Sequence, residues 1–163
     1  MAAITAPVFN LSQYGYVFFG FGFLLMIPTL ILITYRYIKY TEIDDKNKPF
    51  ICIYPALLSI LTVGYVNALP INSIFLTITY IIACIFYIFG IYNLIKYLVM
   101  EKLNFSPSFS AFTFPFVISA IATIEAHKYF QINILKYLSQ LQSIIALIVV
   151  SFVLYKYLEF LFK

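Results

Sequence analysis

The sequence predicts an all-α integral membrane protein with five transmembrane helices, and three observations support this. Of its 163 residues, 64% are hydrophobic and only 10% are charged, whereas a soluble domain usually carries about a quarter charged residues. The charges are confined to short stretches, which leaves five apolar segments of about 20 residues, the length a helix needs to cross a bilayer. The ten-residue alternating segments of transmembrane strands are missing from the sequence.

We expect these segments to form a single transmembrane domain over residues 1–163. The predicted spans cover approximately residues 14–38, 50–69, 72–98, 106–127 and 134–158. Residues 1–13 carry no charge and lack the basic start of a secretory signal peptide, so we expect a loop there. The polar stretch at residues 41–49 is expected to form an exposed loop between the first two spans.

The polar residues exclude several classes of function. The single histidine and the six acidic residues lie near the ends of spans, so no catalytic group of titratable side chains meets at one depth. Cys52 and Cys84 lie inside spans without CxxC spacing, which predicts buried thiols and no disulfide or metal framework. We therefore expect no enzymatic activity, no catalytic residues, no metal, no cofactor and no nucleic-acid partner. The expected surroundings are a lipid bilayer.

The second and fourth spans share a pattern that the other spans lack. Each contains a proline followed by small or hydroxylated residues, namely Pro55, Ser59 and Thr62 in one and Pro115, Ser119, Ala122 and Thr123 in the other. A proline inside a helix removes a backbone donor, and such a break is tolerated at membrane depth beside neighbours or a water-lined cavity. The small faces fit either close helix packing or an open lumen. The hydroxyl groups fit either helix bonding or pore lining.

The distribution of basic residues predicts the topology. The turn at Pro70 and Asn72 makes the second and third spans an antiparallel hairpin, and alternation of the spans then assigns each charge to a side. Eight basic residues fall on one side, and only Lys128 and Lys136 fall on the other. The eight are Arg36, Lys39, Lys46, Lys48, Lys96, Lys102, Lys156 and Lys163. The positive-inside rule therefore predicts a cytoplasmic carboxyl terminus and an external amino terminus.

The stretch FSAFTFP at residues 109–115 resembles a motif near the end of the tellurite-resistance/dicarboxylate transporter family. This family includes fungal malate permeases and the slow anion channels of plants. The resemblance continues through ISAIAT at residues 118–123 and is joined by Tyr54-Pro55-Ala56 in the second span. The resemblance implies a ring of ten helices in five hairpins around a central pore, of which this chain matches the last five. The second and fourth spans would then be inner helices.

The resemblance also implies roles for particular residues and partners. Phe114 matches the phenylalanine that plugs the pore and swings aside for anions. Pro55, Ser59, Thr62, Pro115, Ser119, Ala122 and Thr123 are the expected pore-lining residues. The implied protein is a multi-pass, plasma-membrane anion channel or carrier of the voltage-independent type. We expect the pore to be completed by a five-span amino-terminal half or another copy, and complete pores to form homo-oligomers.

Several alternatives stay open from the sequence. The transported anion could be a dicarboxylate, tellurite or an inorganic anion, and the mechanism could be that of a channel or a proton-coupled carrier. The chain could be a fragment or a split-gene product of such a transporter. The competing interpretation is a non-conducting structural subunit or an inactive remnant.

Overall fold

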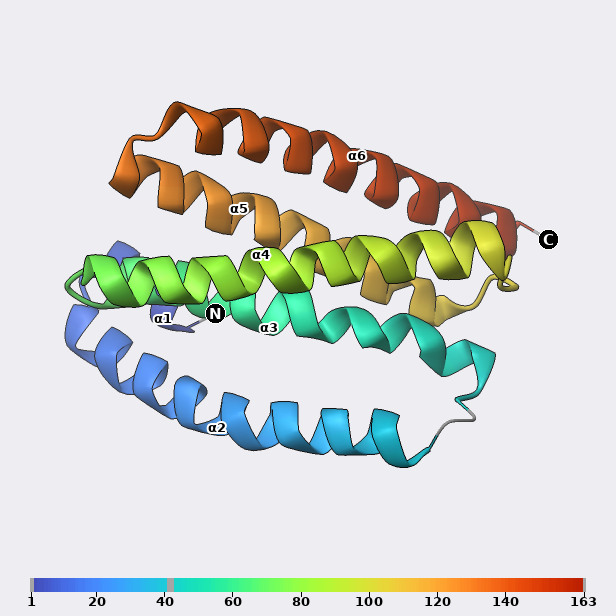
Figure 1. Ribbon diagram of the computed structural model, residues 1–163, viewed down its shortest axis with the longest axis horizontal. Coiled ribbons are helices and arrows are strands. Elements are labelled where there is room, and N and C mark those ends of the chain that lie inside the picture. The colour runs from blue at the N-terminus through green and yellow to red at the C-terminus, as the bar shows by residue number, and fades with distance from the viewer. Residues whose placement is uncertain (1, 41–42, 163) are drawn as a thin grey trace.

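The computed structural model describes residues 2–40 and 43–162 of the chain. Five helices of this part are long and apolar enough to cross a membrane, which confirms the predicted fold class (Figure 1). The α-helices are α1 (Ala2–Thr5), α2 (Ser12–Lys39), α3 (Ile53–Ala68), α4 (Ser73–Ile95), α5 (Thr113–Phe130) and α6 (Asn133–Leu161). The 3-10 helices are η1 (Ala6–Phe9), η2 (Asp45–Cys52) and η4 (Pro107–Phe112), and η3 (Lys96–Met100) is a π-helical turn.

The helices α3 and α5 form the centre of the bundle. They pack against each other, α4 contacts both of them, α6 packs along α5, and α2 lies beside α3. In Figure 1, α4 crosses in front of α3 and α5. In the most apolar stretch of each span, 67% of the residues are buried for α3 and 56% for α5, against 6% for α2 and 17% for α6. The two spans with the proline pattern are therefore the inner pair.

The hairpin between α3 and α4 is fixed by side chains at its turn. The Asn72 side chain accepts hydrogen bonds from the backbone amides of Ile74 and Phe75 at 2.9 and 3.3 Å, which caps α4. Such a cap satisfies amides that have no partner within the helix. The Tyr65 hydroxyl accepts a bond from the Asn72 amide at 2.6 Å and donates to the Pro70 carbonyl at 3.3 Å.

Two predicted loops are partly helical in the structure. The amino-terminal segment forms α1 and η1, and Ile4 packs against a core cluster that α3 and α5 share. In the second predicted loop, η2 begins at Asp45 and Pro49 is buried. Residues 41 and 42 of that loop lie outside the described residues. These segments fold because they lie against the bundle, and the local sequence alone does not reveal that contact.

The structure corrects the predicted position of the proline breaks. Pro55 and Pro115 each occupy the third residue of an α-helix, where η2 leads into α3 and η4 into α5. The first four amides of a helix have no intrahelical acceptor, so a proline there removes no helical hydrogen bond. The proline that does lie inside an α-helix is Pro28 of α2.

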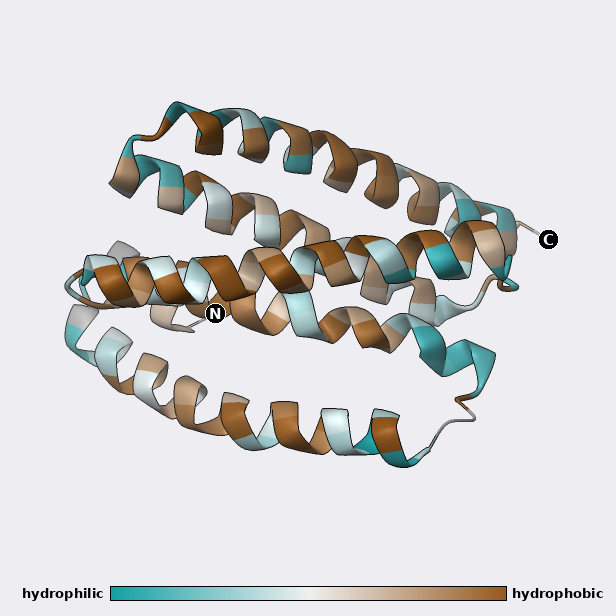
Figure 2. Ribbon diagram, in the orientation of Figure 1, coloured by the Kyte–Doolittle hydropathy of each residue, from teal (hydrophilic) through white to brown (hydrophobic). Residues whose placement is uncertain are grey.

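Polar residues gather near the helix ends, and apolar residues occupy their middles (Figure 2). The carboxyl ends of α2, α4 and α6 and the starts of α3 and α5 meet at one end of the bundle (Figure 1). We call this the basic end, because seven of the eight basic residues that the sequence assigns to one side belong to it. The eighth, Lys163, lies outside the described residues.

Candidate functional site

The small faces of α3 and α5 meet in a buried hydrogen bond. The Ser59 and Ser119 hydroxyl oxygens lie 2.8 Å apart, and both residues are buried. The Ser119 hydroxyl also donates to the Pro115 carbonyl at 2.7 Å. Because a serine hydroxyl has one proton, Ser59 donates to Ser119 in this arrangement. The two central helices are thus joined by polar side chains at a depth where water cannot replace them.

A second polar group joins α5 to α4 and α6. The Thr123 hydroxyl lies 2.6 Å from the Gln142 side-chain oxygen on α6 and 3.1 Å from the Ser119 carbonyl. The Tyr80 hydroxyl on α4 donates to the Thr123 oxygen at 3.1 Å. Gln142 is only 2% exposed, and a buried amide of this kind is stable where it has partners. The sequence analysis did not identify Tyr80 or Gln142.

The remaining predicted pore-lining residues are also buried. The Thr62 hydroxyl donates to the Leu58 carbonyl of its own helix at 3.0 Å. Ala122 belongs to an apolar cluster with Ala56, Val63 and Ile118, between α3 and α5. Pro55 and Pro115 are buried as well. All seven residues therefore lie inside the bundle formed by this chain, and their lining of a pore stays a prediction.

Phe114 differs from its aromatic neighbours. Its side chain is 40% exposed, while Phe112 and Phe116 are fully buried. The exposed residues Val117, Ile121 and Ile124 follow Phe114 at helical spacing and form one stripe. We call Phe114, Val117, Ile121 and Ile124 the open face of α5. The helical spacing of these apolar residues could have identified the stripe in the sequence. The predicted pore-lining residues of this helix were instead the small residues on the neighbouring face.

The inner helix α3 also has a partly uncovered side. Ile53 is exposed, and Leu57 and Ile60 follow it at helical spacing as half-buried residues. We call these three residues the open face of α3. No charged side chain belongs to either open face. The open face of α5 offers apolar surface to a partner, a lumen or lipid, while Leu57 and Ile60 of α3 also line an apolar cavity with residues of α1 and α2.

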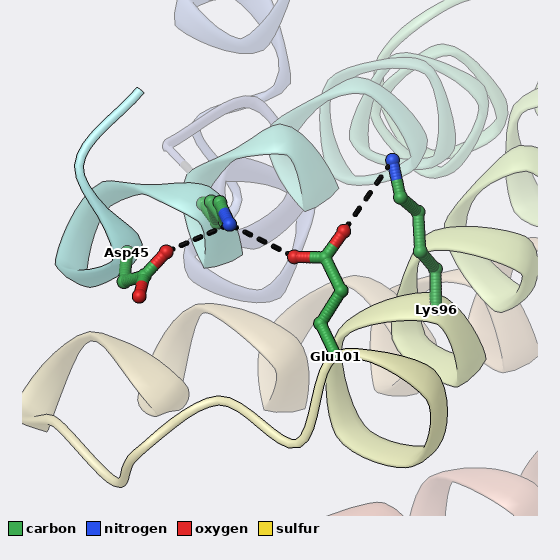
Figure 3. A network of polar contacts seen from close by, with 4 residues as sticks. Asp45, Lys96 and Glu101 are labelled. Carbon is green, nitrogen blue, oxygen red and sulfur yellow. Dashed lines mark hydrogen bonds and ion pairs between the residues drawn. The ribbon is translucent and has the colours of Figure 1, made fainter. Parts of the chain in front are cut away.

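An ionic network lies at the basic end (Figure 3). The Lys48 ammonium lies 2.7 Å from an Asp45 carboxylate oxygen and 2.8 Å from a Glu101 carboxylate oxygen. Lys96 approaches the other Glu101 oxygen at 3.6 Å. The hydrogen bond from Lys48 holds the pKa of Glu101 below its ordinary value. The network ties η2, which leads into α3, to the end of α4, a long-range contact that sequence analysis had no signal to find.

The described thiol and imidazole groups lie at separate places in the bundle. Among the described residues, no group of three or more His, Cys, Asp or Glu side chains is placed to hold a metal ion. Cys52 is a buried free thiol, and Cys84 is a half-buried one. His127 lies near the end of α5, where its ring nitrogen is 3.1 Å from the Ile132 carbonyl.

Comparison with protein-family models matches residues 1–158 to the family described as voltage-dependent anion channels. A search of curated proteins and a search of solved structures each found no match. The family match spans nearly the whole chain and agrees with the resemblance drawn from the FSAFTFP stretch. It also agrees with five apolar helices that can cross a membrane. The chain belongs to the voltage-dependent anion channel family.

Proposed function

We propose that this protein moves small anions across the membrane, with α3 and α5 forming part of the pore wall. The observation that carries the proposal is the exposure of Phe114 on the open face of α5, directly before Pro115 and between two fully buried phenylalanines. Family membership supports anion transport as the general function. Burial of α3 and α5 at the centre of the bundle supports their role as inner helices.

Phe114 would act as the gate of this pore. An apolar ring can close a narrow hydrophobic constriction to ions by excluding water. The neighbouring residues of the open face, Val117 and Ile121, are also apolar, so they would leave the closed path dry. The backbone is 3-10 helical up to Phe112 and α-helical from Thr113, so the ring of Phe114 lies one residue after a change of helix type.

The charge pattern favours weak anion binding. The open faces of α3 and α5 carry no lysine or arginine, so no fixed cation would hold the anion at mid-membrane. Conduction requires easy release as well as easy entry. Arg36 is the only arginine, whereas voltage sensors use arginine-rich helices. Although the family is described as voltage-dependent, these features of this chain favour a voltage-independent type of path for dicarboxylates, tellurite or inorganic anions.

The open faces also imply a partner. A pore wall made of α3 and α5 covers only one side of a lumen, so we propose that five further spans or another copy complete it, and that complete pores assemble as homo-oligomers. We place the protein in the plasma membrane with its carboxyl terminus in the cytoplasm, because the basic end would then face inward.

A second function is a non-conducting structural subunit or an inactive remnant of such a transporter. Its support is the hydrogen bond between Ser59 and Ser119, which joins α3 to α5, and the bond from Thr123 to Gln142, which joins α5 to α6. These hydroxyl groups are thus engaged in helix packing.

Anion flux from proteoliposomes separates the two functions. The protein is reconstituted alone and together with the amino-terminal five spans of a ten-span family member. Flux in either preparation, above that of the added half alone, supports the transport function. Correctly inserted protein without flux in both preparations supports the structural one.

A further inference from the structure

The 3-10 segment η4, which ends two residues before Phe114, is held by hydroxyl groups. The Tyr157 hydroxyl on α6 donates to the Pro107 carbonyl, the first carbonyl of η4. The Ser110 hydroxyl donates to the same carbonyl at 3.0 Å, and the Thr113 hydroxyl donates to the Ser110 carbonyl at 2.7 Å. A carbonyl oxygen has two lone pairs and can accept both bonds. We call these three bonds the hydroxyl ladder, which runs from the end of α6 to the residue before Phe114.

Aromatic rings hold Tyr157 beside η4. The Phe105 ring meets the Tyr157 ring edge-on at 5.1 Å and the Phe109 ring edge-on at 5.3 Å between centroids. Phe105 also packs on Phe160 of α6 at 5.7 Å. Phe109 belongs to η4 and is only 2% exposed. Phe105 therefore lies between α6 and η4, and it keeps the Tyr157 ring next to the carbonyl that its hydroxyl binds.

Pro115 explains why η4 gains from such a contact. If α5 extended back through η4, Pro115 would lie inside an α-helix, and its ring would clash with the Ala111 carbonyl. The segment is instead 3-10 helical, and the Thr113 amide donates to the Ser110 carbonyl three residues back. Hydrogen bonds of a 3-10 helix have poorer geometry than those of an α-helix. The hydroxyl ladder therefore adds stability that the backbone of η4 provides only weakly.

The hairpin of α3 and α4 repeats this arrangement. In each hairpin a tyrosine follows the proline by 42 residues and lies in a Lys-Tyr-Leu triplet. The pairs are Pro55 with Tyr97 and Pro115 with Tyr157. Tyr97 is 7% exposed, and the ammonium of Lys48 in η2 lies over its ring at 5.9 Å. This tyrosine position thus contacts the 3-10 segment of its own hairpin in both copies, through a cation–π contact in one and a hydrogen bond in the other.

We propose that Tyr157 is a positioning residue for the Phe114 ring, an inference that rests on the proposed role of Phe114 as the gate. The Tyr157 hydroxyl holds the first carbonyl of η4, and the hydroxyl ladder transmits that constraint to Thr113. With the bond in place, the ring stays in the position that closes the lumen. Without it, η4 loosens and the ring leaves that position more often, so water and anions pass more readily.

Hydrogen exchange with mass spectrometry tests the contact in this chain alone, in lipid nanodiscs and without any transport. Tyr157→Phe keeps the ring and removes only the hydroxyl. Exchange of the backbone amides in residues 107–113 should become about fivefold faster, the factor that corresponds to one hydrogen bond of ordinary strength. Ser110→Ala removes a second bond of the ladder and should act in the same direction. Tyr155→Phe is the matched control on the same helix, because its ring is 64% exposed, and it should leave this exchange unchanged.

Anion current in the complete pore, formed with a five-span amino-terminal half, tests the effect on the gate. Tyr157→Phe should raise the current at normal expression. It should add nothing to the current of Phe114→Ala, because the ring that it positions is then missing. A tyrosine with a merely structural role would instead lower the current in both backgrounds, in proportion to the loss of folded protein.

The two measurements separate this inference from the proposed gate. Unchanged exchange in Tyr157→Phe, or an equal rise in current with and without the Phe114 ring, would overturn the role of Tyr157 without contradicting the gate. Faster exchange in Tyr157→Phe together with an unchanged current in Phe114→Ala would overturn the gate, and with it the effect of Tyr157 on transport. The contact between α6 and η4 would then be purely structural.

Discussion

The hydroxyl of Ser59 lies 2.8 Å from the hydroxyl of Ser119, so a hydrogen bond between side chains joins the two inner helices. It forms between two buried side chains on α3 and α5, which pack against each other. Within a membrane, where apolar burial gives little preference for one helix contact over another, such bonds help to fix the packing.

We expect this bond to be measurable by a double-mutant cycle. Ser59→Ala should lower the free energy of unfolding by about 0.6–1.7 kcal/mol, from the average to the largest value of interhelical hydrogen bonds in membranes. The loss in Ser59→Ala/Ser119→Ala should be smaller than the sum of the single losses, because the second substitution removes a partner already lost. Unfolding in mixed detergent micelles provides the measurement, with Ser143→Ala as a control whose hydroxyl bonds within its own helix. Additive losses would show that the bond contributes nothing.

Gly90 on α4 lies in close contact with the start of α3. A Cβ atom added there would lie 3.0 Å from Cγ of Pro55 and 3.9 Å from Cζ of Phe116. Gly90→Ala should therefore destabilise the bundle by about 1–3 kcal/mol through overpacking. Gly20→Ala is the matched control, since no atom lies within 4 Å of its added Cβ. Equal stability of the two variants, measured by the same unfolding assay, would contradict the observed helix packing.

The ionic network at the basic end predicts a dependence of stability on pH. The pKa of Glu101 is lowered in the folded protein by its bond from Lys48. Because this pKa is lowered, the ionised Glu101 carboxylate stabilises the folded protein. Its contribution to stability is fully present above pH 4.5, the ordinary pKa, and is lost as the pH falls through the lowered pKa. Thermal unfolding of the wild type should therefore show a small loss of stability in acid. This loss of stability in acid should be absent from Glu101→Gln and from Lys48→Met. If both variants still lose stability in acid as the wild type does, the loss belongs to other titrating groups.

The predicted topology can be tested with reporters. A reporter fused after residue 163, or inserted near Asp45, should be located in the cytoplasm because eight basic residues belong to that side. A tag placed before Pro7 should be accessible from outside. An external carboxyl-terminal reporter would reverse the assignment and place the basic end of α2 in the other leaflet.

The spans and the hairpin could be predicted from the sequence because their causes are local. Charge-free segments determine where a helix can cross lipid, and the short turn at Pro70 and Asn72 requires that α3 and α4 run antiparallel. The 3-10 helices before Pro55 and Pro115 could not be predicted in this way. A proline excludes certain hydrogen bonds, but the sequence does not show where the α-helix around it begins.

The candidate site was only partly predictable for a related reason. Helical spacing groups Ser119 and Ala122 on one face, but it does not reveal which neighbour covers that face. The structure places this face against α3, and it places Phe114 on the open face of α5 instead. The bonds of Thr123 to Gln142 and Tyr80 depend on three separate helices. Such contacts follow from tertiary packing, and no local pattern encodes them.

The most direct test of the proposed pore compares two phenylalanines that lie two residues apart. Phe114 is 40% exposed on the open face of α5, while Phe112 is fully buried and packs edge-on against Phe109 at 5.7 Å. Phe112→Ala should therefore reduce the yield of folded protein, at a cost of about 3–5 kcal/mol. Phe114→Ala should have a much smaller effect on stability, because less of its surface is buried.

The deciding measurement is the anion current of both variants in the complete pore, formed by this chain with a five-span amino-terminal half. If the Phe114 ring closes the lumen, its removal restores a continuous water path. We predict that Phe114→Ala raises the anion current markedly at normal expression, while Phe112→Ala lowers the current in proportion to the folded protein. An unchanged or reduced current for normally expressed Phe114→Ala would contradict the gate and show that the ring only packs against a neighbour.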